Sequence, residues 1–423
     1  MTSTSTSPGD RSKRPWLSLA VSALLMAAFL GACDAAGSGA GAVYTALAPG
    51  KPAAAEHTKA LDALPGSVRP NYDGFWNFAR LGPNPYDKWK PGKAPWSFCY
   101  SSAYQGNPWR VAGLDQAQRL FGQLKAKGLA KGTLTSADAN NSTMLQSTQI
   151  SNMVQRNCDV ILVMQPPSTG LCSAFQKAQR AGSLVVVMQT GTTCTNVIQS
   201  DIGEYAAAGT TARWLAQRAG RGDTVLLCRG IPGVTAAETR ESAARRAFEA
   251  AGLRVDTING DWTPSTVKAQ TLRYLATHPG KVAGAWDSGN CATPMGQAFQ
   301  QAHRPVPPIA AYDLTDSWLA FSRDAGDRPS TSLIHGPRSC VYEAFVVATR
   351  MLSGQKPRVN TLLYPIPVAD TKDFPKYAAP GMTVNSAGTA EPTDGRPVAD
   401  AYYDALFTGG SPAPALDPMT GQR

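Results

Sequence analysis

Arg240 is the residue whose type and position suggest ligand binding most directly. It lies in the first turns of a predicted helix, after a strand-forming run at 224–228 and a turn rich in Gly and Pro. In an open α/β sheet, ligands bind beyond the carboxyl ends of the strands. An arginine there offers five N–H donors in a fixed fork, which suits adjacent hydroxyls or a carboxylate. We predict a ligand contact; the alternative is an ion pair with Glu238 or Glu241.

The remaining reactive side chains predict neither catalysis nor metal binding. The four histidines, His57, His278, His303 and His335, show no partnered arrangement of the kind a hydrolase needs. The sequence contains no nucleophile elbow and no cysteine pair at C-x-x-C spacing, and no histidine stands at zinc spacing. We therefore expect a binding protein with no catalytic residue, no metal and no cofactor.

Short apolar runs alternate with amphipathic segments from Trp96 onward. The predicted strands are 96–100, 132–137, 159–164, 184–189, 224–228, 254–258, 282–286, 308–312, 332–334 and 362–368. Alternation of strand and helix predicts parallel sheets with helices on both faces. A chain of 423 residues, 43% of them apolar, can bury two ordinary cores. We place a corner at 200–203 between the first four strands and the rest, and we expect the chain to cross between two domains more than once.

The N-terminus has the order of residues that marks an export signal. Three basic residues before position 15 precede an apolar run at 16–30 and the tetrapeptide Leu-Gly-Ala-Cys, which ends at Cys33. This tetrapeptide resembles a bacterial lipobox, in which the cysteine becomes the lipid-modified first residue of the mature chain. We predict a lipoprotein-type signal peptide at 1–32 and lipidation of Cys33. Ordinary secretory cleavage is the alternative.

The composition on either side of the predicted core indicates segments outside it. Residues 33–95 begin with Ala, Gly, Ser and Pro and continue with aromatic residues and prolines, which predicts a tether and an irregular segment. Residues 370–423, rich in Pro, Gly and Ala, predict a tail on the surface. The formal net charge is +10 at pH 7, but Lys and Arg do not form the blocks typical of nucleic-acid binding.

Cysteines in an exported chain favour disulfides over metal ligands. Seven follow Cys33: Cys99, Cys158, Cys172, Cys194, Cys228, Cys291 and Cys340. Two of them, Cys172 and Cys194, come just after consecutive predicted strands, whereas Cys291 and Cys340 each open a late predicted helix. We predict Cys172–Cys194 and Cys291–Cys340 disulfides, and the odd total leaves at least one cysteine unpaired.

Several motifs in a fixed order give the chain from Trp96 to Val368 a resemblance to the ribose-type periplasmic binding proteins, the sugar-receiving components of ABC importers. The motifs are the Gly230-Ile231-Pro232-Gly233 turn before Arg240, Asn107-Pro108-Trp109 after the first strand, and Asp261-Trp262-Thr263. The resemblance implies the type I periplasmic binding protein fold, in which two Rossmann-like lobes with parallel sheets are joined by a multi-strand hinge. It places lobe 1 at 96–200 plus 336–354 and lobe 2 at 201–335 plus 355–369.

The resemblance also implies a set of ligand contacts between the lobes. These are Asn107, Trp109, Gln189, Thr190, Arg240, Trp262, Asp287, Asn290, Asp313 and His335. The two tryptophans would stack on a sugar ring from opposite lobes, and Gln189-Thr190 replaces an Asp-Arg pair of the family. Ordinary packing is the alternative for the tryptophans, helix capping for Asp313 and hinge packing for His335.

The function implied is capture of a carbohydrate or related polyol between the lobes and its delivery to an ABC permease. Arg110, Arg240 and His335 near the cleft also leave a sugar acid open as the ligand. We expect a monomer that is exported to the periplasm or the outer face of the cell membrane and held there by lipid. A sensing module that reports to a membrane receptor or kinase is the alternative. An extracellular hydrolase is disfavoured by the scattered histidines, and a DNA-binding regulator by an export signal in place of a helix-turn-helix.

Overall fold

A computed structural model of the chain describes residues 55–72, 80–106, 108–164, 169–189, 191–326, 328–392, 396 and 398–418. The predicted signal peptide, Cys33 and much of the predicted tether lie outside these ranges, as do Asn107 and Thr190. Within the described ranges, no helix is long and apolar enough to cross a lipid bilayer.

The first sheet has six parallel strands in the order β12-β5-β4-β3-β1-β2. Its strands are β1 (Phe98–Ser102), β2 (Thr135–Asp138), β3 (Val160–Met164), β4 (Leu184–Met188), β5 (Ile198–Ile202) and β12 (Thr361–Tyr364). The central strands β3 and β4 consist entirely of Val, Ile, Leu and Met and are buried along their whole length. Such strands are typical of a parallel sheet that is covered on both faces.

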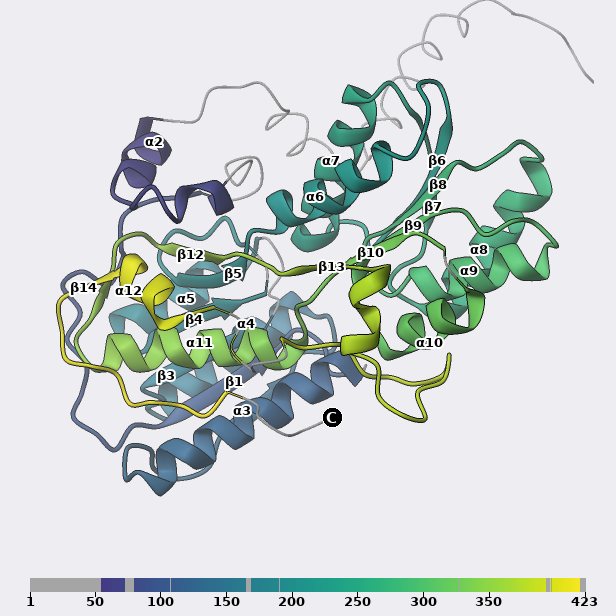
Figure 1. The fold of residues 1–423 in the computed structure, drawn as a ribbon. Helices are drawn as coiled ribbons and strands as arrows, with labels where there is room; N and C mark the ends of the chain where they lie inside the picture. Colours follow the sequence, from purple (N-terminus) through teal and green to yellow (C-terminus); the bar gives the residue numbers. More distant parts are fainter. Residues whose placement is uncertain are drawn as a thin grey trace, which may run out of the picture. The chain divides into compact units, whose positions relative to one another are not determined.

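Helices cover both faces of this sheet (Figure 1). The pair α3 (Pro108–Ala126) and α11 (Pro337–Leu352) packs on one face, and the pair α4 (Thr143–Gln155) and α5 (Cys172–Arg180) on the other. Successive residues of a strand point to opposite faces, so Leu162 packs in the core with α3 and α11 whereas Ile161 packs in the core with α4 and α5. We call this sheet with its four helices lobe 1.

The second sheet has six strands in the order β13-β10-β9-β8-β6-β7. Its strands are β6 (Thr224–Arg229), β7 (Arg254–Asn259), β8 (Gly284–Asp287), β9 (Ile309–Asp313), β10 (Ser330–Leu333) and β13 (Val368–Asp370). The edge strand β13 is antiparallel to β10, and the other neighbours are parallel. One face carries α6 (Glu204–Ala216) and α7 (Thr235–Ala250); the other carries α8 (Pro264–Thr277), α9 (Ala292–Gln301) and α10 (Asp316–Ala325) (Figure 1). We call this sheet with its five helices lobe 2.

Most of the corner predicted at 200–203 is strand β5, although the chain does pass from lobe 1 to lobe 2 directly after it, as the sequence predicted. This strand is part of lobe 1, and α6 begins directly after it at Glu204. The sequence hid the strand because its central residues, such as Gln199 and Asp201, are polar although all five strand residues are buried. The side-chain amide of Gln199 donates to and accepts from the backbone of Thr192, which satisfies it inside the protein.

The strand predicted at 362–368 is in fact two strands in different sheets. In lobe 1, β12 pairs with β5, whereas in lobe 2 β13 pairs with β10. The return to lobe 2 therefore lies between Tyr364 and Val368, later than the boundary at 355 that the sequence predicted. In the described part of the chain, the connections β5 to α6, β10 to α11 and β12 to β13 join the two sheets, which gives a multi-strand hinge.

The C-terminal tail contributes to the cores of both lobes, which is more than the surface position predicted for it. Phe374 and Ala390 are buried in the core of lobe 2, and Tyr403 and Leu406 in the core of lobe 1. The last two belong to α12 (Asp400–Leu406), after which β14 (Phe407–Thr408) pairs with β11 (Lys356–Pro357). The tail therefore adds a further connection between the lobes.

The structure contains the disulfides Cys99–Cys158, Cys172–Cys194 and Cys228–Cys291. Of the two predicted bonds, Cys172–Cys194 is present. The predicted Cys291–Cys340 bond is wrong: Cys291 lies at the start of α9, next to the end of β6, so its Cα is 6.4 Å from that of Cys228. Cys340 is a buried free cysteine on α11 of lobe 1.

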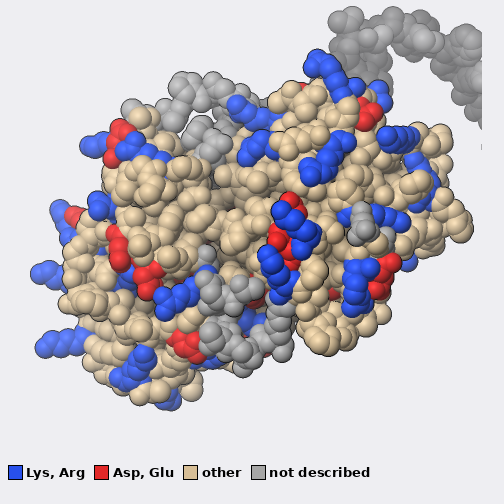
Figure 2. Space-filling view, in the orientation of Figure 1, with Lys and Arg blue, Asp and Glu red and all other residues tan. Residues whose placement is uncertain are grey.

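Charged side chains are dispersed over the face drawn in Figure 2. Lys and Arg lie singly or close to Asp and Glu, without a field of one sign on this face. Exposed ion pairs of the described residues include Lys356–Asp87 and Arg396–Asp400. The surface shown thus lacks the basic stripe by which nucleic-acid-binding proteins are recognised.

Candidate functional site

Arg240 on α7 is buried in lobe 2 and held by two partners. Its Nε and Nη2 atoms donate to the two carboxylate oxygens of Glu204, at 2.5 and 2.9 Å, and Nη1 donates to the carbonyl oxygen of Ser288 at 2.8 Å. Only 5% of the residue is exposed. Burial alone would lower the pKa of Arg240, but the attraction of Glu204 outweighs it, so the pKa lies above its ordinary value and the guanidinium stays charged.

The acidic partners that the sequence suggested for Arg240 are wrong, although the residue does form an ion pair. Glu238 and Glu241 both pair with Arg229, at the end of β6, and not with Arg240. The guanidinium of Arg240 instead lies over the ring of Tyr312, with its central carbon 3.7 Å from the ring centroid. This stacking and the Glu204 pair fix the plane of the fork before any ligand arrives.

Gly289 marks the point where three of the predicted ligand residues meet. A Cβ atom built on Gly289 would lie 3.1 Å from Asp313 Oδ2, 3.3 Å from Arg240 Nη1 and 3.3 Å from Trp262 Nε1. Its φ of +128° is also one that residues with side chains rarely adopt. A carboxylate, a guanidinium and an indole therefore surround one small region after β8, at the edge where α/β sheets bind ligands.

Asp313 supplies the carboxylate of this region. The capping alternative for Asp313 is wrong, because the N-cap of α10 is Thr315. The pKa of Asp313 is raised to about 6. Burial is the main cause of this rise and Glu204 adds to it, whereas the positive charges of Arg240 and His335 reduce it. An aspartate at the end of a strand, facing an arginine, can accept hydrogen bonds from two ligand hydroxyls.

Asp287, at the end of β8, is used within the turn that follows it. Its oxygens accept hydrogen bonds from three backbone N–H groups between Gly289 and Ala292, at 2.5, 3.0 and 3.1 Å. Burial and, to a smaller extent, the carboxylate of Asp313 raise the pKa of Asp287 to about 7, against the three N–H donors, which lower it. The side chain thus fixes the start of α9 and shapes the turn that carries Asn290, whose φ is 56°.

A cavity of about 470 Å³ adjoins this region and brings together residues of both lobes. Trp109 lines it from the start of α3, and Trp262, Asp287 and Asn290 line it from lobe 2. The two tryptophans predicted to face each other thus border one space. Among the residues that the structure describes, Arg240 and Asp313 do not line this cavity. Trp262 lines the cavity and also lies beside Gly289, so it connects the two regions.

Gln189 and His335 lie in a different group, around the thiol of Cys340 at the hinge. The thiol donates to Oε1 of Gln189 and lies 3.5 Å from Nδ1 of His335. On the other side of the ring, Nε2 lies 3.4 Å from Oε2 of Glu343. Burial lowers the pKa of His335, but Glu343 outweighs it and holds the pKa above its ordinary value. These buried contacts favour hinge packing, the alternative given for His335.

Several residues of the site were missed in the sequence. They are Glu204, Ser288, Tyr312, Cys340 and Glu343. Glu204 was hidden because β5 was taken for a corner, so the start of α6 was not placed beside Arg240. The acidic residue at the first position of α6 was the available signal. Across the described part of the chain, no group of three His, Cys, Asp or Glu side chains is placed to hold a metal ion.

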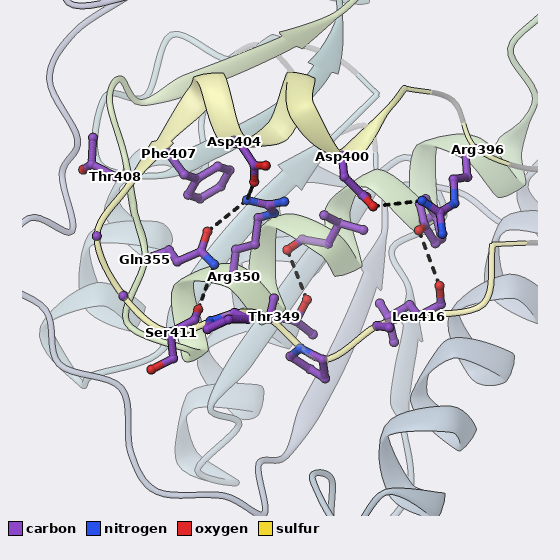
Figure 3. A pocket seen from close by; sticks show the side chains of 18 residues that line it. Thr349, Arg350, Gln355, Arg396, Asp400, Asp404, Phe407, Thr408, Ser411 and Leu416 are labelled. Carbon is purple, nitrogen blue, oxygen red and sulfur yellow. Dashed lines mark hydrogen bonds and ion pairs between the residues drawn. The ribbon is translucent and has the colours of Figure 1, made fainter.

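A second cavity, of about 560 Å³, lies between α11 and the tail, away from the predicted ligand residues. Figure 3 shows Arg350 between Gln355 and Asp404, to which it donates at 3.0 and 2.8 Å. Gln355 in turn donates to the backbone of Ser411. Because these polar groups satisfy one another, we assign the second cavity to the docking of the tail on lobe 1.

Comparison with known proteins identifies the family. Residues 98–356, more than half of the chain, match the family model described as periplasmic binding protein domain. Among solved structures, an ABC transporter solute binding protein from Thermobispora bispora is 23% identical, with a TM-score of 0.60 over 68% of this chain and 88% of that one. No curated protein matches the chain.

Two further solved structures contain a bound small molecule. An ABC transporter periplasmic solute binding protein from Actinobacillus succinogenes, with bound D-allose, is 18% identical, with a TM-score of 0.58 over 67% of this chain and 100% of that one. An ABC transporter solute binding protein from Mycobacterium smegmatis, with bound glycerol, is 17% identical, with a TM-score of 0.59 over 70% and 100%. These likenesses show the shared fold. On the match of its core, the chain belongs to the periplasmic binding protein domain family.

Proposed function

We propose that this protein captures a neutral sugar or related polyol between its two lobes and delivers it, chemically unchanged, to an ABC importer. The observation that carries the proposal is the meeting of Arg240, Trp262 and Asp313 within 3.3 Å of one point beside Gly289. The N–H groups of Arg240 that Glu204 and Ser288 leave over, a carboxylate acceptor and an indole are groups that bind vicinal hydroxyls and the C–H face of a sugar ring. Membership of the family, and the allose and glycerol bound in two proteins of the same fold, support the same function.

The charges of the site support a neutral ligand over a sugar acid. Glu204 occupies two arms of Arg240, and Glu343 lies beside His335, so two of the three cations that the sequence placed near the cleft already have an acid partner. The carboxylate of Asp313 would repel a second carboxylate brought by the ligand. The sugar acid that the sequence left open is therefore the less favoured ligand.

The same proposal includes a place outside the cytoplasm, as the family implies. Lipid on Cys33 would hold the protein at the outer face of the membrane, which the basic, apolar and small residues before it support. The Gly- and Ser-rich residues that follow would serve as a flexible tether. A single copy of the chain holds all the residues proposed for the site, which fits a monomer.

Isothermal titration of the purified protein against neutral monosaccharides, polyols and the matching uronic acids tests this function. We expect at least one neutral compound to bind and its uronic acid to bind more weakly. Asp313→Asn should weaken the binding by about tenfold or more, since it removes a charged acceptor. The matched control is Asp324→Asn, because Asp324 is exposed and pairs only with its neighbour Arg323 among the partners observed. No binding to any compound would refute the proposal.

A further inference from the structure

The C-terminal tail forms a third wall of the cavity between the lobes. Residues 384–389 line the cavity together with Trp109 of lobe 1 and Trp262 of lobe 2. In Figure 1, the yellow-green tail runs past α10 before it continues to α12. A segment some 90 residues after α9 in the sequence thus completes a space that the two sheets leave open.

This part of the tail is held in place by backbone pairing to lobe 2. The N–H of Asp316 donates to the carbonyl of Gly388 at 2.9 Å, and the N–H of Ala390 donates to the carbonyl of Leu314 at 2.8 Å. Between them, Thr389 and Thr315 form an antiparallel bridge. A side chain at Gly388 would meet the carboxylate of Asp316, which would have to move aside to make room for it.

The tail is also attached at the hinge, directly after the wall segment. The carboxylate of Glu391 accepts hydrogen bonds from the backbone N–H groups of Gly336, Arg338 and Ser339 at 3.1, 3.0 and 3.3 Å. These groups form the start of α11, where unpaired N–H donors attract an anion. With both attachments, residues 384–389 are a fixed part of the site.

The chemistry of this wall differs from that around Gly289. It offers the exposed amide of Asn385 to a cavity that Trp109 also lines, and it brings no acidic side chain. Arg240 and Asp313 are not among the described lining residues, so a ring held by them leaves the cavity unfilled. A volume of about 470 Å³ falls within the range of roughly 300–1,000 Å³ of pockets for drug-sized ligands.

We propose that the cavity is an outer subsite for a second sugar ring, so that the ligand is a disaccharide or glycoside. The inference rests on the proposed function and extends it to the size of the ligand. The first ring lies beside Gly289, against Arg240 and Asp313. The second ring stacks on Trp109 and donates or accepts hydrogen bonds at Asn385.

Calorimetric titration with monosaccharides and the disaccharides built from them tests the subsite. The probes are glucose with maltose and cellobiose, galactose with lactose, and arabinose with arabinobiose. The measured quantity is the ratio of the monosaccharide Kd to the disaccharide Kd. We expect a ratio of about ten or more for at least one pair, the size of one added aromatic contact and hydrogen bond.

Two variants test whether the higher affinity for disaccharides arises at the tail. Asn385→Ala should lower the ratio by about threefold or more, as one lost hydrogen bond predicts. The control Asn152→Ala removes an exposed amide from α4 of lobe 1 and should leave the ratio unchanged. Monosaccharide binding with a ratio near one, or a ratio unaffected by Asn385→Ala, would overturn the subsite and leave the proposed function standing. If none of the sugars binds, both proposals fall.

Discussion

At the scale of single residues, the site depends on a buried ion pair and not on a free arginine. Arg240 and Glu204 bind each other through two hydrogen bonds, and each is at most 6% exposed in its side chain. An ion pair of this kind fixes geometry, but it leaves a costly charge when one partner is removed. A loss of ligand binding after mutation of Arg240 therefore has two components, the lost contact and the disturbed fold.

Arg240→Ala should destabilise the protein by about 3–5 kcal/mol, because Glu204 keeps its burial and loses its partner. Urea unfolding measures this loss, and titration with the best ligand measures the loss of affinity. The double variant with Glu204→Gln should regain part of the stability, since the unpaired charge is gone, while the affinity stays low. Wild-type stability of Arg240→Ala alone would contradict the ion pair.

The buried acids predict that stability falls as the pH rises from about 4 to about 7. Burial raises the pKa of Asp287 to about 7 and that of Asp313 to about 6, from 3.8 for both. Between these values the folded protein binds more protons than the unfolded chain, so the free energy of unfolding decreases with rising pH, by roughly 1.4 kcal/mol per pH unit for each such acid. His335, whose pKa is raised mainly by Glu343 against the effect of burial, adds to the decline only above its ordinary pKa of 6.5.

Thermal unfolding between pH 4.5 and 7.5 checks this dependence. Asp313→Asn should flatten it below pH 6, because the amide does not titrate. A melting temperature that increases steadily across the same range would show that the acids are ionised in the fold at low pH.

At the scale of elements, apolar strands could be predicted from the sequence and polar ones could not. The runs in β3 and β4 contain no polar residue, so the sequence alone predicted that they form strands and that these strands are buried. In β5 the polar residues Gln199 and Asp201 are buried, and a buried polar group needs hydrogen-bond partners that other segments supply. No local sequence pattern predicts those partners. The same limit explains why Glu204 was missed while Arg240 was found.

The correction of the cysteine pairing gives a prediction for one element of lobe 2. The Cys228–Cys291 bond ties the end of β6 to the start of α9 and spans 63 residues. Cys291→Ala should therefore cost about 2–5 kcal/mol in the free energy of unfolding. The comparison is Cys340→Ala, which removes a free thiol from α11 and should cost less. Peptide mapping without reduction that found Cys291 joined to Cys340 would restore the original prediction.

At the scale of the whole molecule, the sequence predicted two lobes but not the part played by the tail. Strand and helix alternation, together with the resemblance, indicated both sheets. The pairing of Thr389 with Thr315, and the contact of Glu391 with the start of α11, join segments that are far apart in sequence and have no shared pattern. Contacts of that kind follow only from the completed fold.

Membrane attachment is the prediction that concerns the protein in the cell. If Cys33 carries lipid, the mature protein should partition into the detergent phase of Triton X-114, and Cys33→Ser should move it to the aqueous phase. The sugar-binding constants of the two forms should agree, since no residue of the site lies near the signal sequence in the chain. Recovery of the wild-type protein in the aqueous phase would favour ordinary secretory cleavage, and detergent partition that persists in Cys33→Ser would contradict lipid attachment at this residue.

The disulfides of the described residues also bear on how the protein reaches its working form. Cys99–Cys158 and Cys172–Cys194 lie within lobe 1, and Cys228–Cys291 lies within lobe 2. Each half of the molecule can therefore be oxidised as soon as it has folded, without waiting for the other half. Since none of these covalent bonds joins one lobe to the other, a change in the redox state outside the cytoplasm would alter the stability of each lobe and leave the connection between the lobes unchanged.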